Sequence, residues 1–197
     1  MSGSAATTLD ELVEAARAGS AVAFEAIWRT LSPVVAGYLR GRGAQDVEDL
    51  TSEVFLGAFQ RLPTFEGDGA AFRRWLFTIA HHRSADDLRR RVRRAVEEPY
   101  EPESDPRRVP SAADDALAHL AQAEVLTLLA DLPEDQRNVL LLRIVADLAV
   151  ADVAAVMHRS PDAVRQLHHR AVARLRRGLL GPHEPVTEST PETMAQS

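Results

Sequence analysis

Cysteine and lysine are both missing from this 197-residue chain, so all 23 of its basic side chains are arginine. Without thiols the chain cannot form disulfides, thiolate metal sites or a cysteine nucleophile. Aromatic residues are scarce, at 5%, and no apolar run approaches the length of a membrane span. The amino terminus also lacks the basic start and apolar stretch of a signal peptide. We therefore expect a cytoplasmic protein.

Hydrophobic residues make up 45% of the chain, and the abundance of alanine, leucine and valine suits helices better than sheets. Prolines mixed with acidic residues interrupt the pattern after about residue 97, which indicates a boundary. The chain is therefore predicted to be all-α, with two small helical domains joined by a flexible acidic linker. The expected parts are an N-terminal domain at 8–96, the proline-rich linker at 97–113, a C-terminal domain at 114–180 and a disordered tail at 181–197.

Helix signals place the individual elements. Thr8 to Glu11 fits a capping box at the start of the first helix, and Pro33 is expected near a helix start or bend. Loop chemistry, with two glycines and an aspartate, separates two later helices. The other predicted elements are a strong helix at residues 46–62 that Pro63 ends, the loop at 64–70 and a long helix at 71–96. A helix at 114–130 follows, and Pro133 opens the next one.

Charge is segregated along the chain, although the net charge is −6. Residues 71–94 hold eight arginines against two aspartates, which gives +6, and residues 159–177 hold six arginines against one aspartate, which gives +5. Residues 97–115 between them carry −5. Two basic blocks separated by an acidic one indicate contacts with a polyanion at two places.

The segment at 148–177 reads as two helices joined by a tight turn. Val153, Ala154 and Met157 form the inner face of the first, and His158 lies in the turn. Ser160 is a natural N-cap, with Pro161 at the first position of the second helix. Val164, Ala171 and Leu175 recur on one side of that helix, which leaves Arg165, Gln166, His169 and Arg170 outward. This pattern predicts a helix-turn-helix whose second helix reads a major groove, although an αα-hairpin with a solvated arginine face remains possible from the pattern alone.

The helix at 46–62 has two faces. An apolar face, including Val54 and Phe55, can pack in a core, whereas Asp49, Glu53 and Leu56 fall on the opposite side. A leucine inside an acidic stripe is what a partner-binding face with a central anchor would show. A single exposed leucine is also common and needs no partner.

The helix from residue 71 changes character along its length. Phe72 and Trp75 share a face with Leu76, whereas the arginines at its far end form a run that can neutralise phosphates. Its aromatic residues could stack on the bases of an opened strand, although at least two among Phe72, Trp75 and Phe77 are expected in the core.

Four stretches in order resemble the extracytoplasmic-function (ECF) sigma factors, which are promoter-specificity subunits of bacterial RNA polymerase. Residues 46–59 are similar to the acidic core-binding helix of that family, and residues 72–90 resemble its promoter-melting, −10-reading helix. Residues from 132 onward resemble the start of its C-terminal domain, and residues 163–171 its −35-reading helix. Two positions depart from the family pattern. His82 replaces a usual amide, and His158 replaces a usual turn glycine, where a histidine can adopt left-handed backbone only at some cost.

The resemblance implies that the chain directs core polymerase to promoters and assists their opening, with core polymerase and promoter DNA as partners and, in some family members, an anti-sigma factor. It implies no cofactor and no membrane insertion. The residues implied for polymerase binding are Asp46, Asp49, Ser52, Glu53, Leu56 and Gln60. Those implied for the single-stranded −10 element are Arg73, Arg74, Trp75, His82, Arg83, Asp86, Arg89 and Arg90. Those implied for the −35 duplex are Ser160, Arg165, Gln166, His169, Arg170 and Arg174.

Two other functions compete with this interpretation. A stand-alone helix-turn-helix regulator would account for residues 148–177 but leaves the helices at 46–62 and 71–94 without a role. An enzyme is suggested only by the pairs His81-His82 and His168-His169, whose members point about 100° apart on a helix. No nucleophile elbow, phosphate loop or metal-ligand spacing accompanies them, so we expect no catalytic residue and no metal site.

Overall fold

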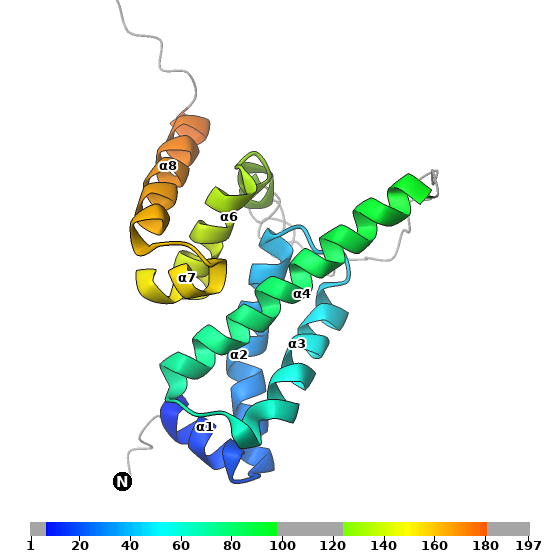
Figure 1. Ribbon diagram of the computed structural model, residues 1–197, viewed down its shortest axis with the longest axis vertical. Coiled ribbons are helices and arrows are strands. Elements are labelled where there is room, and N and C mark those ends of the chain that lie inside the picture. Colours follow the sequence, from blue (N-terminus) through cyan, green and yellow to red (C-terminus); the bar gives the residue numbers. More distant parts are fainter. Residues whose placement is uncertain (1–6, 98–123, 181–197) are drawn as a thin grey trace, which may run out of the picture.

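The computed structural model describes residues 7–97 and 124–180. Within these ranges every regular element is helical, as Figure 1 shows, and the all-α prediction is confirmed. The predicted linker beyond residue 97, the predicted helix before residue 124 and the predicted tail lie outside the described residues. The elements are α1 (Leu9–Arg17), α2 (Ala21–Gly41), α3 (Val47–Arg61), the 3-10 turn η1 (Leu62–Thr64), α4 (Gly69–Glu97), helical residues 124–130, α6 (Glu134–Leu140), the π-helical turn η2 (Leu141–Val145), α7 (Val150–Met157) and α8 (Pro161–Leu180).

Side-chain caps fix the first helices. The Thr8 side chain accepts a hydrogen bond from the Glu11 amide, and the Glu11 carboxylate accepts one from the Thr8 amide at 2.9 Å, so the predicted capping box is confirmed. Ser20 caps α2 in the same way through the Ala23 amide. Each cap satisfies backbone donors that a helix start would otherwise leave unpaired.

Pro33 does not mark a helix start, because it lies in the interior of α2 and the helix continues past it. Proline removes one helical hydrogen bond, but Pro33 is on the exposed side of α2. Leu31 and Val35 on either side of it are fully buried. Burial of the opposite face outweighs the lost bond and holds the helix together.

The long helix α4 begins at Gly69, two residues before the predicted start. The Gly69 amide donates to the Asp10 carboxylate at 2.6 Å, and the Ala71 amide donates to the Asp68 carboxylate at 2.8 Å. Aspartates therefore cap this helix from two directions, one of them supplied by α1. The predicted loop is therefore confirmed for residues 65–68, and only its last two residues, Gly69 and Ala70, belong to the helix.

The N-terminal half is a bundle in which α2, α3 and α4 lie side by side, with α1 across one end (Figure 1). Aromatic rings in and beside its core are in edge-to-face contact. The buried Phe55 lies 4.7 Å from the partly exposed Trp28 between ring centroids, and the buried Tyr38 lies 5.5 Å from Phe77. Such pairs add about 0.5–1.5 kcal/mol each beyond the burial of their area. The predicted core face of α3 is confirmed, since Val54 and Phe55 are buried.

The C-terminal half contains the predicted helix-turn-helix, formed by α7 and α8. His158 between them has φ +52° and so does adopt the left-handed conformation for which glycine is usual. Asp147 has a similar φ of +51° before α7, which the sequence did not indicate. Val153 and Ala154 of α7 and Val164 and Ala171 of α8 are buried, as expected for helices that pack on each other.

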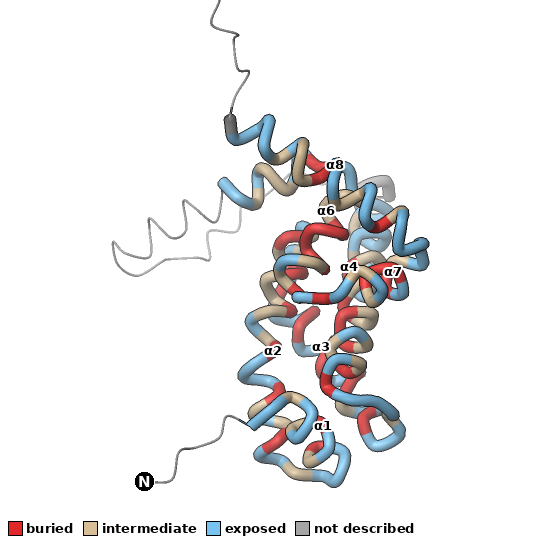
Figure 2. Tube along the Cα trace, turned by 90° about the vertical axis from the view of Figure 1, so that its left-hand side faces the viewer, coloured by how far each residue is buried: buried red, intermediate tan, exposed pale blue. Residues whose placement is uncertain are grey.

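The two halves pack against each other through α4 and α7 and through α2 and η2. One buried apolar cluster extends from Val13 in α1 to Val164 in α8, and Figure 2 shows buried residues on helices of both halves. The sequence predicted two helical domains but no such contact between them. Among residues 7–97 and 124–180, no helix combines the length and apolar character that a membrane span requires.

Candidate nucleic-acid interface

Helix α8 presents a polar face held in place by the rest of the helix-turn-helix. The Ser160 hydroxyl accepts a hydrogen bond from the Ala163 amide, as predicted for an N-cap. The four side chains expected on the outer face are all exposed: Arg165, Gln166, His169 and Arg170. Arg165 forms an ion pair with Asp162 one turn earlier. Guanidinium and amide groups on a rigid, exposed helix are suited to reading base edges in a major groove.

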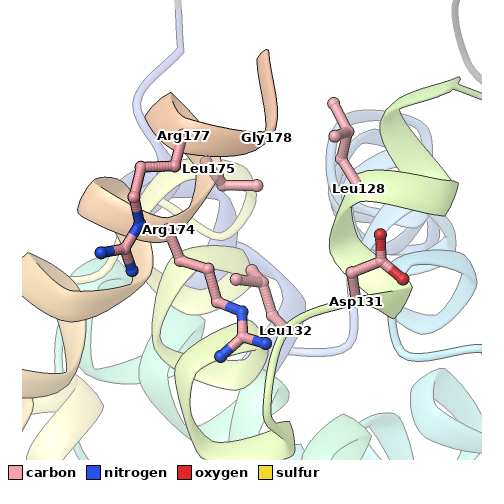
Figure 3. Close-up of a pocket in the computed structure, with 7 residues that line it drawn as sticks. All are labelled: Leu128, Asp131, Leu132, Arg174, Leu175, Arg177 and Gly178. Atoms are coloured by element: carbon pink, nitrogen blue, oxygen red, sulfur yellow. The ribbon is translucent and has the colours of Figure 1, made fainter. Parts of the chain in front are cut away.

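Arg174, also expected at DNA, lies where the second half of α8 faces the helical residues 124–130. It lines a cavity of about 600 Å³ (Figure 3), and Arg177 comes from the same helix. Leu128 and Asp131 line the opposite side. Arg174 is therefore at the edge of the reading face and not at its centre.

The distal half of α4 carries the densest positive charge. A cavity of about 370 Å³ is lined by Arg83, Asp86, Arg89, Arg90 and Arg93. Asp86 is exposed, and the hydrogen bond that it accepts from Arg89 lowers the pKa of its carboxyl group. Asp86 is thus ionised and holds the Arg89 guanidinium in place. A phosphate or a flipped base could enter this cavity between the guanidinium groups.

The proximal half of α4 differs from expectation, because its predicted DNA contacts are engaged within the protein. The Arg73 guanidinium donates to the Ala146 carbonyl at 3.1 Å, and Arg74 pairs with Asp152 of α7 at 2.9 Å. Trp75 is half-buried and stacks on Phe65 with the ring centroids 5.0 Å apart. Phe72 and Phe77 are fully buried, so two of the three aromatics are in the core as predicted.

His81 and His82 have different environments. The Nδ1 atom of His81 accepts hydrogen bonds from the Tyr38 hydroxyl at 2.8 Å and from the Arg42 guanidinium at 3.0 Å. Burial, and then the Arg42 charge, lower the pKa of His81 to about 4. Burial also raises the pKa of Tyr38 to about 12, so Tyr38 keeps its proton as the donor. His82 is exposed, and its ring lies 6.2 Å from that of His158.

The candidate polymerase-binding face on α3 is open to solvent. All six of its predicted residues are exposed, and Leu56 is 60% exposed. Glu53 lies 3.5 Å from Arg83 of α4, which connects this face to the basic end of α4. The Ser52 hydroxyl donates to the Glu48 carbonyl and so faces its own helix. The six residues are Asp46, Asp49, Ser52, Glu53, Leu56 and Gln60.

Arg42 is the main feature that sequence reasoning missed. Its side chain is only 4% exposed, and it bonds to Asn138 at 2.6 Å and to Glu134 at 3.3 Å as well as to His81. These partners are distant in sequence, so no local pattern could identify them. Among the described residues, no three acidic or histidine side chains are grouped closely enough to hold a metal ion.

Comparison with known families gives two matches. The chain matches sigma-70 region 2 over residues 27–94 and sigma-70 region 4 over residues 122–175. The first match contains α3 and most of α4, and the second contains the helix-turn-helix. The two matched regions therefore contain the exposed face of α3, the basic distal half of α4 and the polar face of α8.

Several curated proteins are similar over most of the chain. The ECF RNA polymerase sigma factor BldN of Streptomyces coelicolor is 37% identical over 172 residues, which cover 85% of this chain and 64% of that protein. ShbA of Streptomyces griseus is 32% identical, covering 86% of this chain and 94% of its own length. SigD of Mycobacterium tuberculosis is 33% identical, with 85% and 82% covered. Among solved structures, CnrH in complex with the cytosolic domain of CnrY matches with a TM-score of 0.65 at 25% identity, over 87% of this chain and 97% of that one.

Proposed function

The chain belongs to the ECF family of RNA polymerase sigma factors, and from this premise we propose which of its surfaces serves each step of initiation. As a sigma factor it directs core RNA polymerase to specific promoters and assists promoter opening. The assignment of residues to these steps is our proposal. It rests on three exposed surfaces on separate helices, namely α3, distal α4 and α8.

The α3 face binds core polymerase. Its exposed carboxylates, Asp49 and Glu53, lie two turns and one turn before the exposed Leu56 on the same helix, which suits an apolar anchor beside polar groups. Asp46, Ser52 and Gln60 extend the same face along the helix. A basic partner surface with an apolar pocket would complement it.

The distal half of α4 holds the opened strand at the −10 element. Arg83, Arg89 and Arg90 line the cavity with Asp86, where they can bind phosphates while Asp86 accepts from a base edge. His82 is exposed and directly precedes Arg83, which lines this cavity. Its ring supplies a surface on which a base can stack. Arg73, Arg74 and Trp75 remain proposed contacts. Arg73 and Arg74 must first be released from Ala146 and Asp152 of the C-terminal half, and Trp75 from Phe65.

Helix α8 reads the −35 duplex. Arg165, Gln166, His169 and Arg170 contact base edges in the major groove, while Arg174 binds the phosphate backbone and Ser160 orients the start of the helix. Phosphate contacts position a protein on DNA, whereas base contacts specify the sequence.

We further propose that the protein acts in the cytoplasm, catalyses no reaction itself and needs no cofactor. The similar protein CnrH is described in complex with the cytosolic domain of CnrY. A regulatory partner of that kind, an anti-sigma factor, is proposed for this chain as well.

In vitro transcription with purified core polymerase on genomic DNA fragments tests the function. We expect promoter-specific transcripts only when the chain and core polymerase are both present. A gel-shift assay with the chain alone tests the competing function. Tight, specific duplex binding without polymerase, together with no transcription, would instead indicate a stand-alone helix-turn-helix regulator.

A further inference from the structure

Arginines that line the cavity on distal α4 form ion pairs with carboxylates of the same protein. The pairs are Arg83 with Glu53, Arg89 with Asp86 and Arg90 with Asp87. A guanidinium held by a carboxylate offers fewer donors to a phosphate than a free one does. The partners of these arginines therefore affect how strongly the cavity binds an opened strand.

The pair of Arg83 differs from the other two in its origin. Asp86 and Asp87 come from α4 itself, three residues before their arginines. Glu53 comes from α3, which lies beside α4 (Figure 1), and its Oε2 atom is 3.5 Å from Nη1 of Arg83. Glu53 is also an exposed carboxylate of the α3 face that is proposed to bind core polymerase. One residue thus belongs to that face and contacts the DNA cavity.

Glu53 is accessible to a second partner. Its side chain is 45% exposed, and that of Arg83 is 46% exposed, so the pair is open to solvent. Gly57 lies one turn after Glu53 on α3, and a Cβ added there would meet nothing within 4 Å. The surface beside Glu53 therefore has room for a basic side chain of another protein.

A basic partner that binds Glu53 competes with Arg83 for the same carboxylate. When Glu53 is engaged by the partner, the Arg83 guanidinium is released and can donate to a phosphate in bidentate geometry. Thermodynamic linkage makes the effect reciprocal. A phosphate bound to Arg83 also makes Glu53 more available to the basic partner.

We propose that Glu53 is a positioning residue for the −10 cavity, which holds Arg83 in the free chain and releases it when the α3 face binds core polymerase. Binding of the polymerase on α3 thereby strengthens binding of the opened strand on α4. The inference rests on the proposed functions of the α3 face and of distal α4.

The size of the effect follows from the exposure of the pair. An ion pair that is half open to solvent shifts a binding equilibrium by up to about fivefold. Salt screens such a pair, so the effect is largest at low ionic strength. The coupling therefore adjusts two binding steps and does not by itself switch either of them on.

Arg83→Gln tests the coupling from the polymerase side. Glu53 loses its internal partner in this variant, so we expect core polymerase to bind the full chain up to about fivefold more tightly than it binds the wild type. Titration of the fluorescently labelled chain with purified core polymerase at low salt measures the affinity. Arg89→Gln is the matched control, because it removes the same charge from the same cavity but releases only Asp86 of α4. Its affinity should stay close to that of the wild type.

Variants of Glu53 test the coupling from the DNA side, in the absence of polymerase. Glu53→Gln removes the charge, whereas Glu53→Asp keeps it on a side chain one methylene shorter, which draws it back from Arg83. Both variants should bind a fluorescein-labelled oligothymidine more tightly than the wild type, by up to about fivefold. Asp49→Asn removes a charge from the same α3 face outside the Arg83 pair, so it is the control and should bind as the wild type does.

A double-mutant cycle decides whether the effect passes through Arg83. In the Arg83→Gln background, the two Glu53 substitutions should leave the affinity for oligothymidine unchanged. A gain that persists in that background would overturn the inference, as would equal affinity of Arg83→Gln and Arg89→Gln for core polymerase. Either result beside normal promoter-specific transcription by the wild-type chain would leave the proposed function intact and show that the two surfaces act independently. Absence of that transcription would instead remove the proposed function, and the coupling with it.

Discussion

At the residue scale, His81 is a neutral imidazole that lies between the Tyr38 hydroxyl and the charged Arg42 guanidinium. It accepts from both Tyr38 and Arg42, and its neighbours include the further imidazoles of His82 and His158. Burial and the Arg42 charge disfavour its protonated form. The neutral state is therefore a condition of the native contact.

This gives a prediction of pH dependence. The pKa of His81 is about 4 in the folded chain and about 6.5 in the unfolded chain, so the unfolded chain binds more protons between these values. The stability that His81 contributes is complete above pH ~6.5 and is lost as the pH falls toward ~4, with a total on the order of 3 kcal/mol. Chemical denaturation at pH 7 and pH 4.5 measures it.

His81→Asn is the matched variant, because an amide oxygen can accept from Tyr38 and Arg42 but does not titrate. The wild-type chain should lose more stability than the variant between the two pH values. Carboxylates titrate equally in both proteins, so they cancel in the difference. An identical pH dependence of the two would mean that His81 is not the responsible group.

His158 illustrates strain at a single residue. Left-handed backbone at φ +52° is unfavourable for a residue with a Cβ, and glycine adopts it without that cost. We expect His158→Gly to raise the free energy of unfolding by about 0.5–1 kcal/mol, measured by urea denaturation. Loss of stability would show that the contact of its ring with His82 outweighs the strain.

At the scale of the element, α3 and α8 each bury one face and leave the other exposed. Their apolar spacing predicted both buried faces, because a helix can only pack the residues that recur every three or four positions. The partner of each exposed face can be tested by mutation, because exposed residues contribute little to the stability of the fold.

Leu56→Arg on α3 should abolish association with core polymerase, because it places a charge at the apolar centre of the docking face. Leu56 is 60% exposed, so the helical content and the melting temperature should change little. Co-purification with core polymerase measures the effect. Val22→Arg on α2, at a position 76% exposed, is the control and should bind normally; equal binding by both variants would refute the α3 assignment.

Arg165→Ala and Arg170→Ala on α8 should each relax the base preference at the −35 element by about 1–3 kcal/mol for a lost bidentate contact. A base scan of promoter variants in the transcription assay measures this. Arg174→Ala should instead weaken all promoters alike, as a phosphate contact does. If the first two variants keep the wild-type preference, those arginines contact only the backbone.

At the scale of the whole molecule, the described helices contain every surface assigned to polymerase or DNA. Residues 183–197 follow the last of these surfaces and show no apolar period in the sequence. We expect their removal to leave transcription with core polymerase unchanged, measured as transcript yield against the full chain. A large loss of yield would place a function in that segment.

The sequence alone was sufficient for features that depend on near neighbours. The Thr8 capping box, the Ser160 cap, the left-handed His158 and the exposed faces of α3 and α8 all follow from residues within a few positions of one another. Local hydrogen bonding and helical periodicity govern such features, so the linear order of residues carries the information.

Only the tertiary structure decided which residues meet across the two halves. Arg42 with Asn138, Arg74 with Asp152 and Gly41 with Leu141 are far apart along the chain, and nothing near each residue marks its partner. The same holds for Pro33, whose helix persists because buried neighbours on the opposite face hold it. Contacts of this kind depend on packing between whole elements, which local sequence does not encode, and they engage Arg73 and Arg74 of α4 with the C-terminal half.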